Sequence, residues 1–114
     1  MANEIEVALS DAGFVIAGVA ASGEEAIAIA ARQKPDLAVM DVRLAGDRDG
    51  VDTALELLRS HGVRCIFATA HADSETRTRA QAAAPLGWLQ KPYTMASLVL
   101  QVRDALGKLR GQDR

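Results

Sequence analysis

The chain has 114 residues, of which 49% are hydrophobic and 25% are charged, and its formal net charge is −2 at pH 7. This length and composition are typical of one soluble globular domain that can bury a substantial core. Lys and Arg are scattered along the chain, which argues against a nucleic-acid-binding surface, and no apolar stretch is long enough to cross a bilayer. Since the N-terminus also lacks a signal-peptide pattern, we expect a cytoplasmic protein.

The N-terminal third predicts two helices with a strand between them. Residues 1–12 carry apolar side chains at helical spacing, and Gly13 is placed to end that helix in a left-handed cap. Phe14–Ala20 is rich in β-branched and aromatic residues, which predicts a strand. Ser22 and Glu25 then have the spacing of a capping box, so a second helix is expected to begin there and to end before the next proline.

An apolar run that ends on a carboxylate, Leu37–Asp41, follows this second helix. Such a run predicts a short strand buried on both faces, as in a parallel sheet that helices cover on each side. The polar, glycine-containing stretch Arg43–Gly50 predicts a loop, and apolar residues at helical spacing predict a helix after it that His61-Gly62 closes.

The next predicted strand is Arg64–Ala68, which ends at Thr69 and contains the chain's one cysteine, Cys65. We interpret Cys65 as a small buried hydrophobic residue. Asp73 can cap a helix that runs to about Ala84. The apolar stripe of that helix is mostly alanine, so it buries little area and is the element most able to shift.

The C-terminal part predicts a final strand and a long helix. Leu86–Gln90 is a short apolar run closed by Lys91-Pro92, and Thr94 is placed to cap a helix whose apolar positions extend to Leu109. Because the sequence ends soon after this helix, we expect a single domain over residues 1–114 with no output domain.

Strands that alternate with helices through short connections predict a doubly wound α/β sandwich with a mostly parallel sheet. Right-handed crossovers bring the carboxyl ends of such strands to one edge of the sheet. That edge would collect a carboxylate, a hydroxyl and an ammonium group, from Asp41, Thr69 and Lys91. Ligands of open α/β sheets bind beyond the strand ends, so these side chains are the candidate functional site.

These residues resemble the receiver domain of two-component response regulators, a flavodoxin-like fold also called CheY-like. The resemblance covers Ile5 to Leu109 and is carried, in this order, by Pro35–Asp41, Asp49-Gly50, Phe67–Ala70 and Trp88–Pro92. It implies phosphorelay signal transduction, in which Asp41 accepts a phosphoryl group from a histidine kinase or phosphotransfer protein. It implies a signalling protein and not an enzyme.

The resemblance also implies roles for neighbouring residues. Lys91, before a cis proline, would supply positive charge, Thr69 would bind a phosphoryl oxygen, and Trp88 would be a switch aromatic that turns inward. Asp41 and the backbone carbonyl of Arg43 would bind Mg²⁺. Each residue also has a plainer interpretation: Lys91 as a surface lysine, Thr69 as a β-branched residue that finishes a strand, and Trp88 as a core tryptophan that does not move.

The sequence departs from the family pattern at its start. The family begins with a central strand that ends in an acidic pair, and this sequence opens inside the helix that follows. We therefore expect weak Mg²⁺ binding, because Mg²⁺ sites rely on carboxylates and phosphate oxygens. A central slot would also stay vacant between Phe14–Ala20 and Leu37–Asp41. Those strands must pair directly, borrow a strand from another chain, or leave the sheet partly open.

Three functions compete at this stage. The first is a receiver that relays or stores phosphoryl groups, and the second is a pseudo-receiver that binds partners without phosphorylation. The third is a flavodoxin-like enzyme, although no phosphate-binding glycine loop or nucleophile elbow is present. For the first two we expect a partner surface, and a possible homodimer, through the last two helices, where charges are offered by Arg77, Arg79, Arg103 and Asp104.

Overall fold

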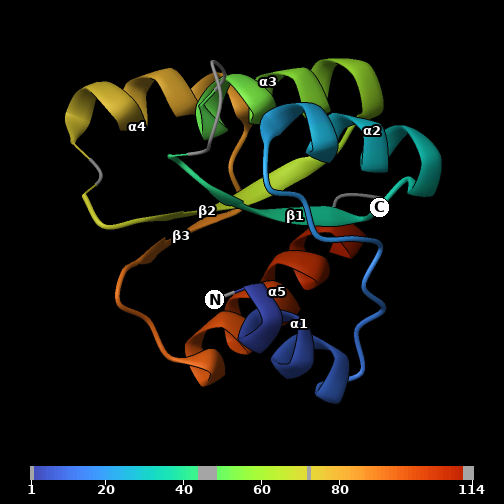
Figure 1. Ribbon diagram of the computed structural model, residues 1–114. Coiled ribbons are helices and arrows are strands. Elements are labelled where there is room, and N and C mark those ends of the chain that lie inside the picture. The colour runs from blue at the N-terminus through green and yellow to red at the C-terminus, as the bar shows by residue number, and fades with distance from the viewer. Residues whose placement is uncertain (1, 44–48, 72, 112–114) are drawn as a thin grey trace.

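The computed structural model describes residues 2–43, 49–71 and 73–111. Their helices and strands are, in chain order, α1 (Ala2–Asp11), α2 (Gly23–Gln33), β1 (Leu37–Asp41), α3 (Gly50–His61), β2 (Arg64–Thr69), α4 (Ser74–Ala80), the 3-10 turn η1 (Gln81–Ala83), β3 (Gly87–Gln90) and α5 (Met95–Gly111). The strands form a parallel sheet in the order β1-β2-β3 (Figure 1). The predicted doubly wound α/β architecture is confirmed.

Helices cover both faces of this sheet. Figure 1 shows α2, α3 and α4 on one face and α1 and α5 on the other. The central strand β2 divides its side chains between the two layers, and its residues Ile66 and Phe67 are both 0% exposed. Cys65 is buried as predicted, and burial raises the pKa of its thiol to about 12.

The helix ends follow the predicted capping chemistry. The Ser22 hydroxyl accepts the amide of Glu25 at 3.2 Å, while the Glu25 carboxylate accepts the amide of Ala21 at 2.6 Å. The amides of Glu25 and Ala21 therefore both have an acceptor. In the standard capping box the carboxylate would accept the amide of the cap residue, Ser22, instead of that of Ala21. Gly13 and Gly62 end α1 and α3 with φ values of 96° and 68°, which glycine adopts without strain.

The prediction of a strand over Phe14–Ala20 is wrong. This segment connects α1 to α2 without strand structure, and β1 pairs with β2 alone among the described residues. β-branched residues favour a strand only where a neighbouring strand supplies main-chain partners. No strand among the described residues pairs with this segment, and Val15 is 95% exposed.

The prediction that β1 is buried on both faces is also wrong. Met40 is buried, but Leu37, Ala38 and Val39 are only half-buried. The cause is a cavity of about 850 Å³ that is lined by β1 and by the Phe14–Ala20 segment. Direct pairing of Phe14–Ala20 with Leu37–Asp41 is not seen among the described residues.

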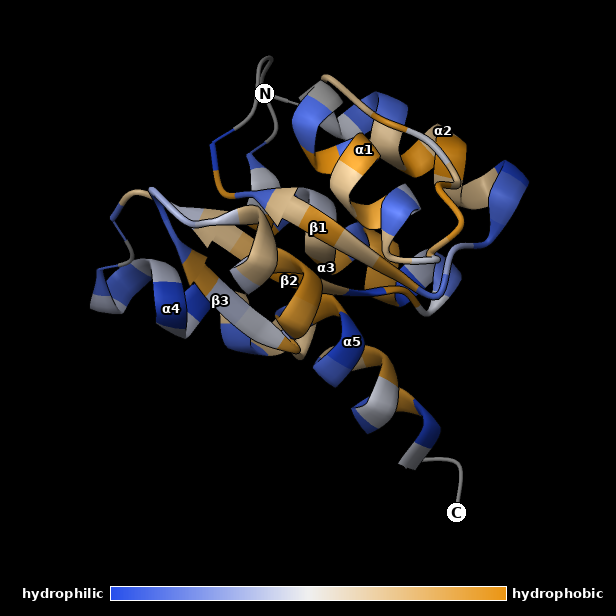
Figure 2. Cartoon of the chain, turned by 90° about the horizontal axis from the view of Figure 1, so that it is seen from below, coloured by the Kyte–Doolittle hydropathy of each residue, from blue (hydrophilic) through white to orange (hydrophobic). Residues whose placement is uncertain are grey.

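The helix expected from Asp73 to about Ala84 ends in a tighter turn. α4 stops at Ala80 and continues as η1, and Ala84 takes a left-handed conformation with φ 52° directly before Pro85. A proline disfavours the right-handed α conformation in the residue before it, so the helical path cannot continue through Ala84. Most residues of α4 are hydrophilic (Figure 2) and only Ala80 of this helix is buried, so the predicted sparse packing is confirmed.

Gly50 joins the end of β1 closely to the start of α3. Its amide donates to the carbonyl of Val42 at 2.7 Å, and a Cβ atom on Gly50 would lie 1.9 Å from the Asp41 carbonyl oxygen. Only glycine fits this contact, because the obstructing atoms belong to the backbone and cannot rotate away.

We therefore expect Gly50→Ala to lower the free energy of unfolding by about 1–3 kcal/mol, the usual cost of overpacking. The matched control is Gly107→Ala on α5, where an added Cβ would meet nothing within 4 Å. Alanine is the better helix former, so this control should gain about 0.5–1 kcal/mol. Denaturant unfolding measures both, and similar effects at the two glycines would contradict the assignment.

Candidate functional site

The three strands deliver polar side chains to one edge of the sheet. Asp41 is the last residue of β1, Thr69 is the last of β2, and Lys91 follows the last residue of β3. The strands are parallel and in register, with Asp41 opposite Ala68, so their carboxyl ends meet at this edge.

The structure brings Asp41 and Lys91 into direct contact. The Lys91 Nζ atom lies 2.6 Å from Asp41 Oδ1, and both side chains are nearly half exposed, at 43% and 46%. The Lys91-Pro92 peptide bond is cis, as the resemblance implied, and the Lys91 amide donates to the Thr69 carbonyl at 2.8 Å. An exposed ion pair contributes little to stability, so its importance is the positive charge that it holds beside a carboxylate.

The Thr69 hydroxyl is engaged elsewhere. Thr69 is only 8% exposed, and its hydroxyl donates to the carbonyl of His71 and accepts the amide of His71, both at 3.2 Å. Thr69 thus lies at the same edge as Asp41, but its hydroxyl is bonded to the chain that leads into α4. His71 itself is exposed.

The described residues offer a poor set of magnesium ligands. They contain no group of three or more His, Cys, Asp or Glu residues that could hold a metal ion. At the Asp41 edge the carboxylate of Asp41 is already paired with Lys91, and Arg43 could add one carbonyl oxygen. Mg²⁺ takes six oxygens in near-ideal octahedral geometry, usually one or two carboxylates together with waters and phosphate oxygens, so Asp41 and Arg43 would supply two of the six. Residues 44–48 of the following loop lie outside the described residues.

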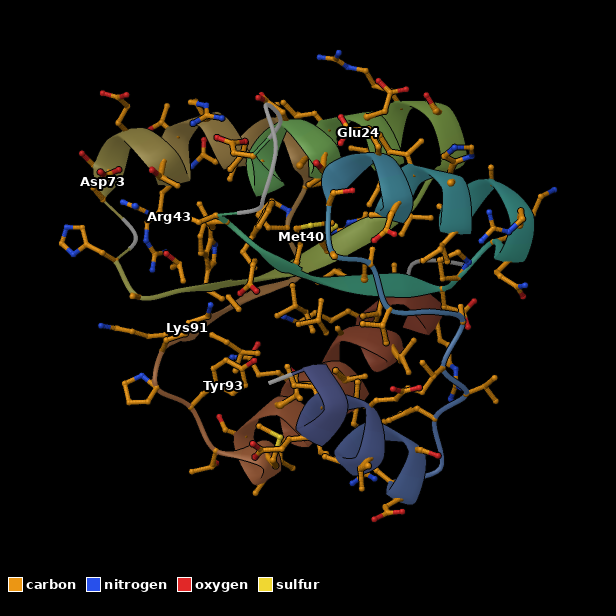
Figure 3. The ribbon with its side chains drawn as sticks, in the orientation of Figure 1. Glu24, Met40, Arg43, Asp73, Lys91 and Tyr93 are labelled. Carbon is orange, nitrogen blue, oxygen red and sulfur yellow. The ribbon has the colours of Figure 1, made fainter. Side chains whose placement is uncertain are left out.

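Tyr93 is a neighbour of the site that the sequence analysis did not identify. Burial raises the pKa of its hydroxyl, the negative charge of Asp41 raises it further, and Lys91 lowers it in part. Figure 3 shows Tyr93 and Lys91 at the end of the sheet where β1 stops. Its position directly after Lys91-Pro92 was the available signal, but no sequence pattern distinguishes it from an ordinary loop aromatic.

A second charged cluster ties α4 to the start of α3. The Asp49 carboxylate caps α3 by accepting the amide of Asp52 at 2.8 Å, and it also accepts Arg79 Nη2 at 2.9 and 3.2 Å. Burial alone would raise the pKa of Asp49, but these bonds outweigh it and hold the pKa below its usual value. Arg79, expected on the partner surface, therefore points toward α3.

Trp88 is packed between the core and a cation. Its ring centroid lies 5.0 Å from that of Phe67, and the Arg77 guanidinium lies 4.7 Å from the Trp88 ring. The side-chain amide of Gln101 donates to the Trp88 carbonyl at 2.8 Å, which joins α5 to β3. Arg103 lies instead 6.0 Å from the Phe14 ring, so the expectation that it shares a surface with Arg77 is wrong. Residues two apart on a helix do not face the same direction, which separates Arg103 from Gln101.

A family model of the response regulator receiver domain matches residues 1–103. The chain belongs to this family. The receiver domain is 32% identical over 102 residues to the transcriptional regulatory protein PdtaR of Mycobacterium tuberculosis, an alignment that covers 90% of this chain and 49% of PdtaR. It is 33% identical over 92 residues to the response regulator GacA of Pseudomonas viridiflava, covering 80% and 42% of the two chains.

Solved structures agree with this assignment. The signal receiver domain of a modulated diguanylate cyclase from Desulfovibrio desulfuricans G20 is 34% identical, with a TM-score of 0.88 over 97% of this chain and 88% of that one. A CheY-like receiver domain protein from Methanospirillum hungatei JF-1 has the same TM-score and coverage at 20% identity, which shows the fold alone. The expected CheY-like fold and two-component context are confirmed.

The receiver domain spans about half the length of the curated relatives that it matches. Within the part of the chain that the structure describes, none of the helices is long and apolar enough to cross a bilayer.

The Asp49–Arg79 pair predicts a defined pH dependence. Because the folded-state pKa of Asp49 is lowered, its contribution to stability is present above the unfolded value of about 3.9 and is lost as the pH falls through the folded pKa. Asp49→Asn keeps a good helix cap and removes the charge. The substitution should therefore lower the free energy of unfolding by less than about 1 kcal/mol at pH 7, and this loss should shrink below about pH 4.

Urea unfolding of the wild type and Asp49→Asn from pH 7 to pH 3 measures this difference. Arg79→Gln is the matched variant, because it removes the other partner of the same bond together with the 3.5 Å contact of Arg79 with Asp52, and the double variant should lose less than the sum of the two single ones. A cost that stays constant with pH, or losses that add in full, would show that the pair is not coupled.

Proposed function

We propose that this receiver domain accepts a phosphoryl group on Asp41 from the phosphohistidine of a histidine kinase or phosphotransfer protein. The supporting observation is the pairing of Asp41, at the exposed carboxyl end of β1, with the Lys91 ammonium at 2.6 Å. Phosphoryl transfer needs a positioned nucleophile and positive charge beside the transferring oxygens, and this pair supplies both.

The transfer is an exchange of one phosphorus bond for another. A carboxylate oxygen of Asp41 attacks phosphorus, an acyl phosphate P–O bond forms, and the P–N bond to the donor imidazole breaks. The imidazole nitrogen keeps the electron pair and takes up a proton. The Lys91 ammonium then shifts its contact from the free carboxylate to the phosphoryl oxygens, where it stabilises their negative charge.

Thr69 links phosphorylation of Asp41 to the position of α4. Its hydroxyl is bonded to the backbone of His71, two residues before the Asp73 cap of α4. If the hydroxyl turns to donate to a phosphoryl oxygen, its bond to the His71 carbonyl breaks and the start of α4 is held less firmly. Only Ala80 is buried in α4, so a shift of this helix costs little.

Trp88 is the natural reporter of such a shift, since its ring lies under Arg77 of α4 and against Phe67 of the core. We propose that the surface formed by α4, β3 and the Gln101 side of α5 binds a protein partner or a second copy of the chain. Mg²⁺ is expected to bind weakly, because the Asp41 edge offers one carboxylate among the described residues.

The direct test is Asp41→Asn. Incubation with a phosphorylated histidine kinase should label the wild type with acid- and base-labile phosphate, and Asp41→Asn should lose at least tenfold of that label. Asp36→Asn, at the opposite end of β1 and exposed, is the matched control and should label normally. Label that persists in Asp41→Asn, or that maps to another carboxylate, would refute the assignment.

The partner surface is tested by charge reversal. Arg77→Glu places a carboxylate over Trp88 and should weaken association with a partner or a second copy several-fold in analytical ultracentrifugation, with labelling of Asp41 intact. Arg103→Glu makes the same change on the Phe14 side of α5 and should have little effect. Loss of association in Arg103→Glu alone would move the interface to the α1 side.

The alternative is a pseudo-receiver that binds its partner without phosphorylation. The poor set of metal ligands among the described residues favours it. Under this alternative, Asp41→Asn leaves partner binding unchanged, whereas the phosphoryl-acceptor function predicts that kinase treatment strengthens partner binding by the wild type alone.

A further inference from the structure

Arg79 ties α4 to the neighbouring helix α3. Its Nη2 atom lies 2.9 and 3.2 Å from the two carboxylate oxygens of Asp49, and 3.5 Å from a carboxylate oxygen of Asp52. Figure 1 shows α3 and α4 side by side on one face of the sheet, so this contact joins two separate helices. It therefore helps to set the position of one helix relative to the other.

The Asp49 end of this contact is held firmly. Its Oδ1 atom accepts the amide of Asp52 at 2.8 Å, and its carbonyl accepts both the amide and the hydroxyl of Thr53, which is fully buried. The next residue, Gly50, is packed against the carbonyl oxygen of Asp41. Asp49 is thus part of the junction between α3 and the strand that carries Asp41.

The Arg79 end belongs to a helix with less buried surface. Only Ala80 is buried within α4. The capping bond from the Thr76 amide to the Asp73 carboxylate stays inside the helix and its cap, so it moves with the helix. A shift of α4 therefore disturbs few contacts besides those of its arginines.

Two arginines hold α4 from different sides. Arg79 contacts Asp49 on the α3 side, whereas the Arg77 guanidinium lies 4.7 Å from the Trp88 ring of β3. Residues two apart on a helix do not face the same direction, so each arginine attaches α4 to a different neighbour. A displacement of α4 away from α3 lengthens the ion pair of Arg79, while Asp49 stays with α3.

We propose that the Asp49–Arg79 pair is a latch that holds α4 in its resting position and opposes the change that phosphorylation of Asp41 favours. This rests on the proposed function, in which the Thr69 hydroxyl turns toward the phosphoryl group and loosens the start of α4. A latch that favours the resting position weakens phosphoryl binding, because the two equilibria are linked. Arg79 is a positioning residue in this scheme, since its contacts are with Asp49 and Asp52.

The size of the effect follows from the exposure of the pair. The side chains of Arg79 and Asp49 are 43% and 37% exposed, and an exposed ion pair changes an equilibrium by about two- to fivefold. Salt screens such pairs, and the screening distance falls to about 3 Å at about 1 M salt. The latch should therefore lose most of its effect at high salt.

The test is equilibrium binding of beryllium fluoride, an analogue of an aspartyl phosphate, in the presence of Mg²⁺. Trp88 is the one tryptophan of the sequence, so its fluorescence reports the titration. We expect Arg79→Gln to bind the analogue about two- to fivefold more tightly than the wild type at low salt, and equally at high salt. Loss of a positive charge by itself weakens the binding of an anion, so tighter binding reports the latch.

Matched variants separate the latch from other effects. Arg59→Gln makes the same change at an exposed position in the last turn of α3, and should bind the analogue as the wild type does. Arg79→Lys keeps the charge without the planar two-oxygen contact, and should lie between the wild type and Arg79→Gln. Asp49→Asn should also bind more tightly, and combining it with Arg79→Gln should add nothing to the effect of Arg79→Gln alone.

Two results would overturn the latch. One is equal affinity of the wild type and Arg79→Gln for the analogue at low salt. The other is a gain that persists at high salt or that appears equally in Arg59→Gln. In both cases the wild type still binds the analogue, so the phosphoryl-acceptor function stands. A wild type that neither binds the analogue nor takes label from a phosphorylated kinase would refute that function, and the latch with it.

Discussion

The pairing of β2 on both of its edges is the constraint on which the rest of this receiver domain depends. β2 satisfies its main-chain groups through β1 on one side and β3 on the other, and it sends Ile66 and Phe67 into opposite layers of the core. The parallel register of these pairs places Asp41 and Lys91 at one edge, close enough for a 2.6 Å contact. The candidate site is thus positioned by strand pairing and not by loops.

The elements around this edge differ in how firmly they are held. Gly50 is packed against the Asp41 carbonyl, so the start of α3 is bound closely to the end of β1. α4 has little buried surface and is attached by the exposed contacts of Arg77 and Arg79. Exposed contacts of this kind are weak and screened by salt, so α4 can move while α3 and the sheet stay in place.

The sequence by itself determined the helices, the three paired strands and the convergence of Asp41, Thr69 and Lys91. These features rest on local signals, because capping at Ser22 and the apolar run before Asp41 act within a few residues, and parallel connection of strands fixes which ends meet. The family followed from the same motifs.

Tertiary structure alone decided that Phe14–Ala20 is not a strand, because its β propensity is local whereas strand structure needs a distant partner. It also decided that the Thr69 hydroxyl bonds to His71, that Arg79 faces Asp49 and that Tyr93 lies near Asp41, because such contacts depend on the direction in which each side chain leaves a folded element.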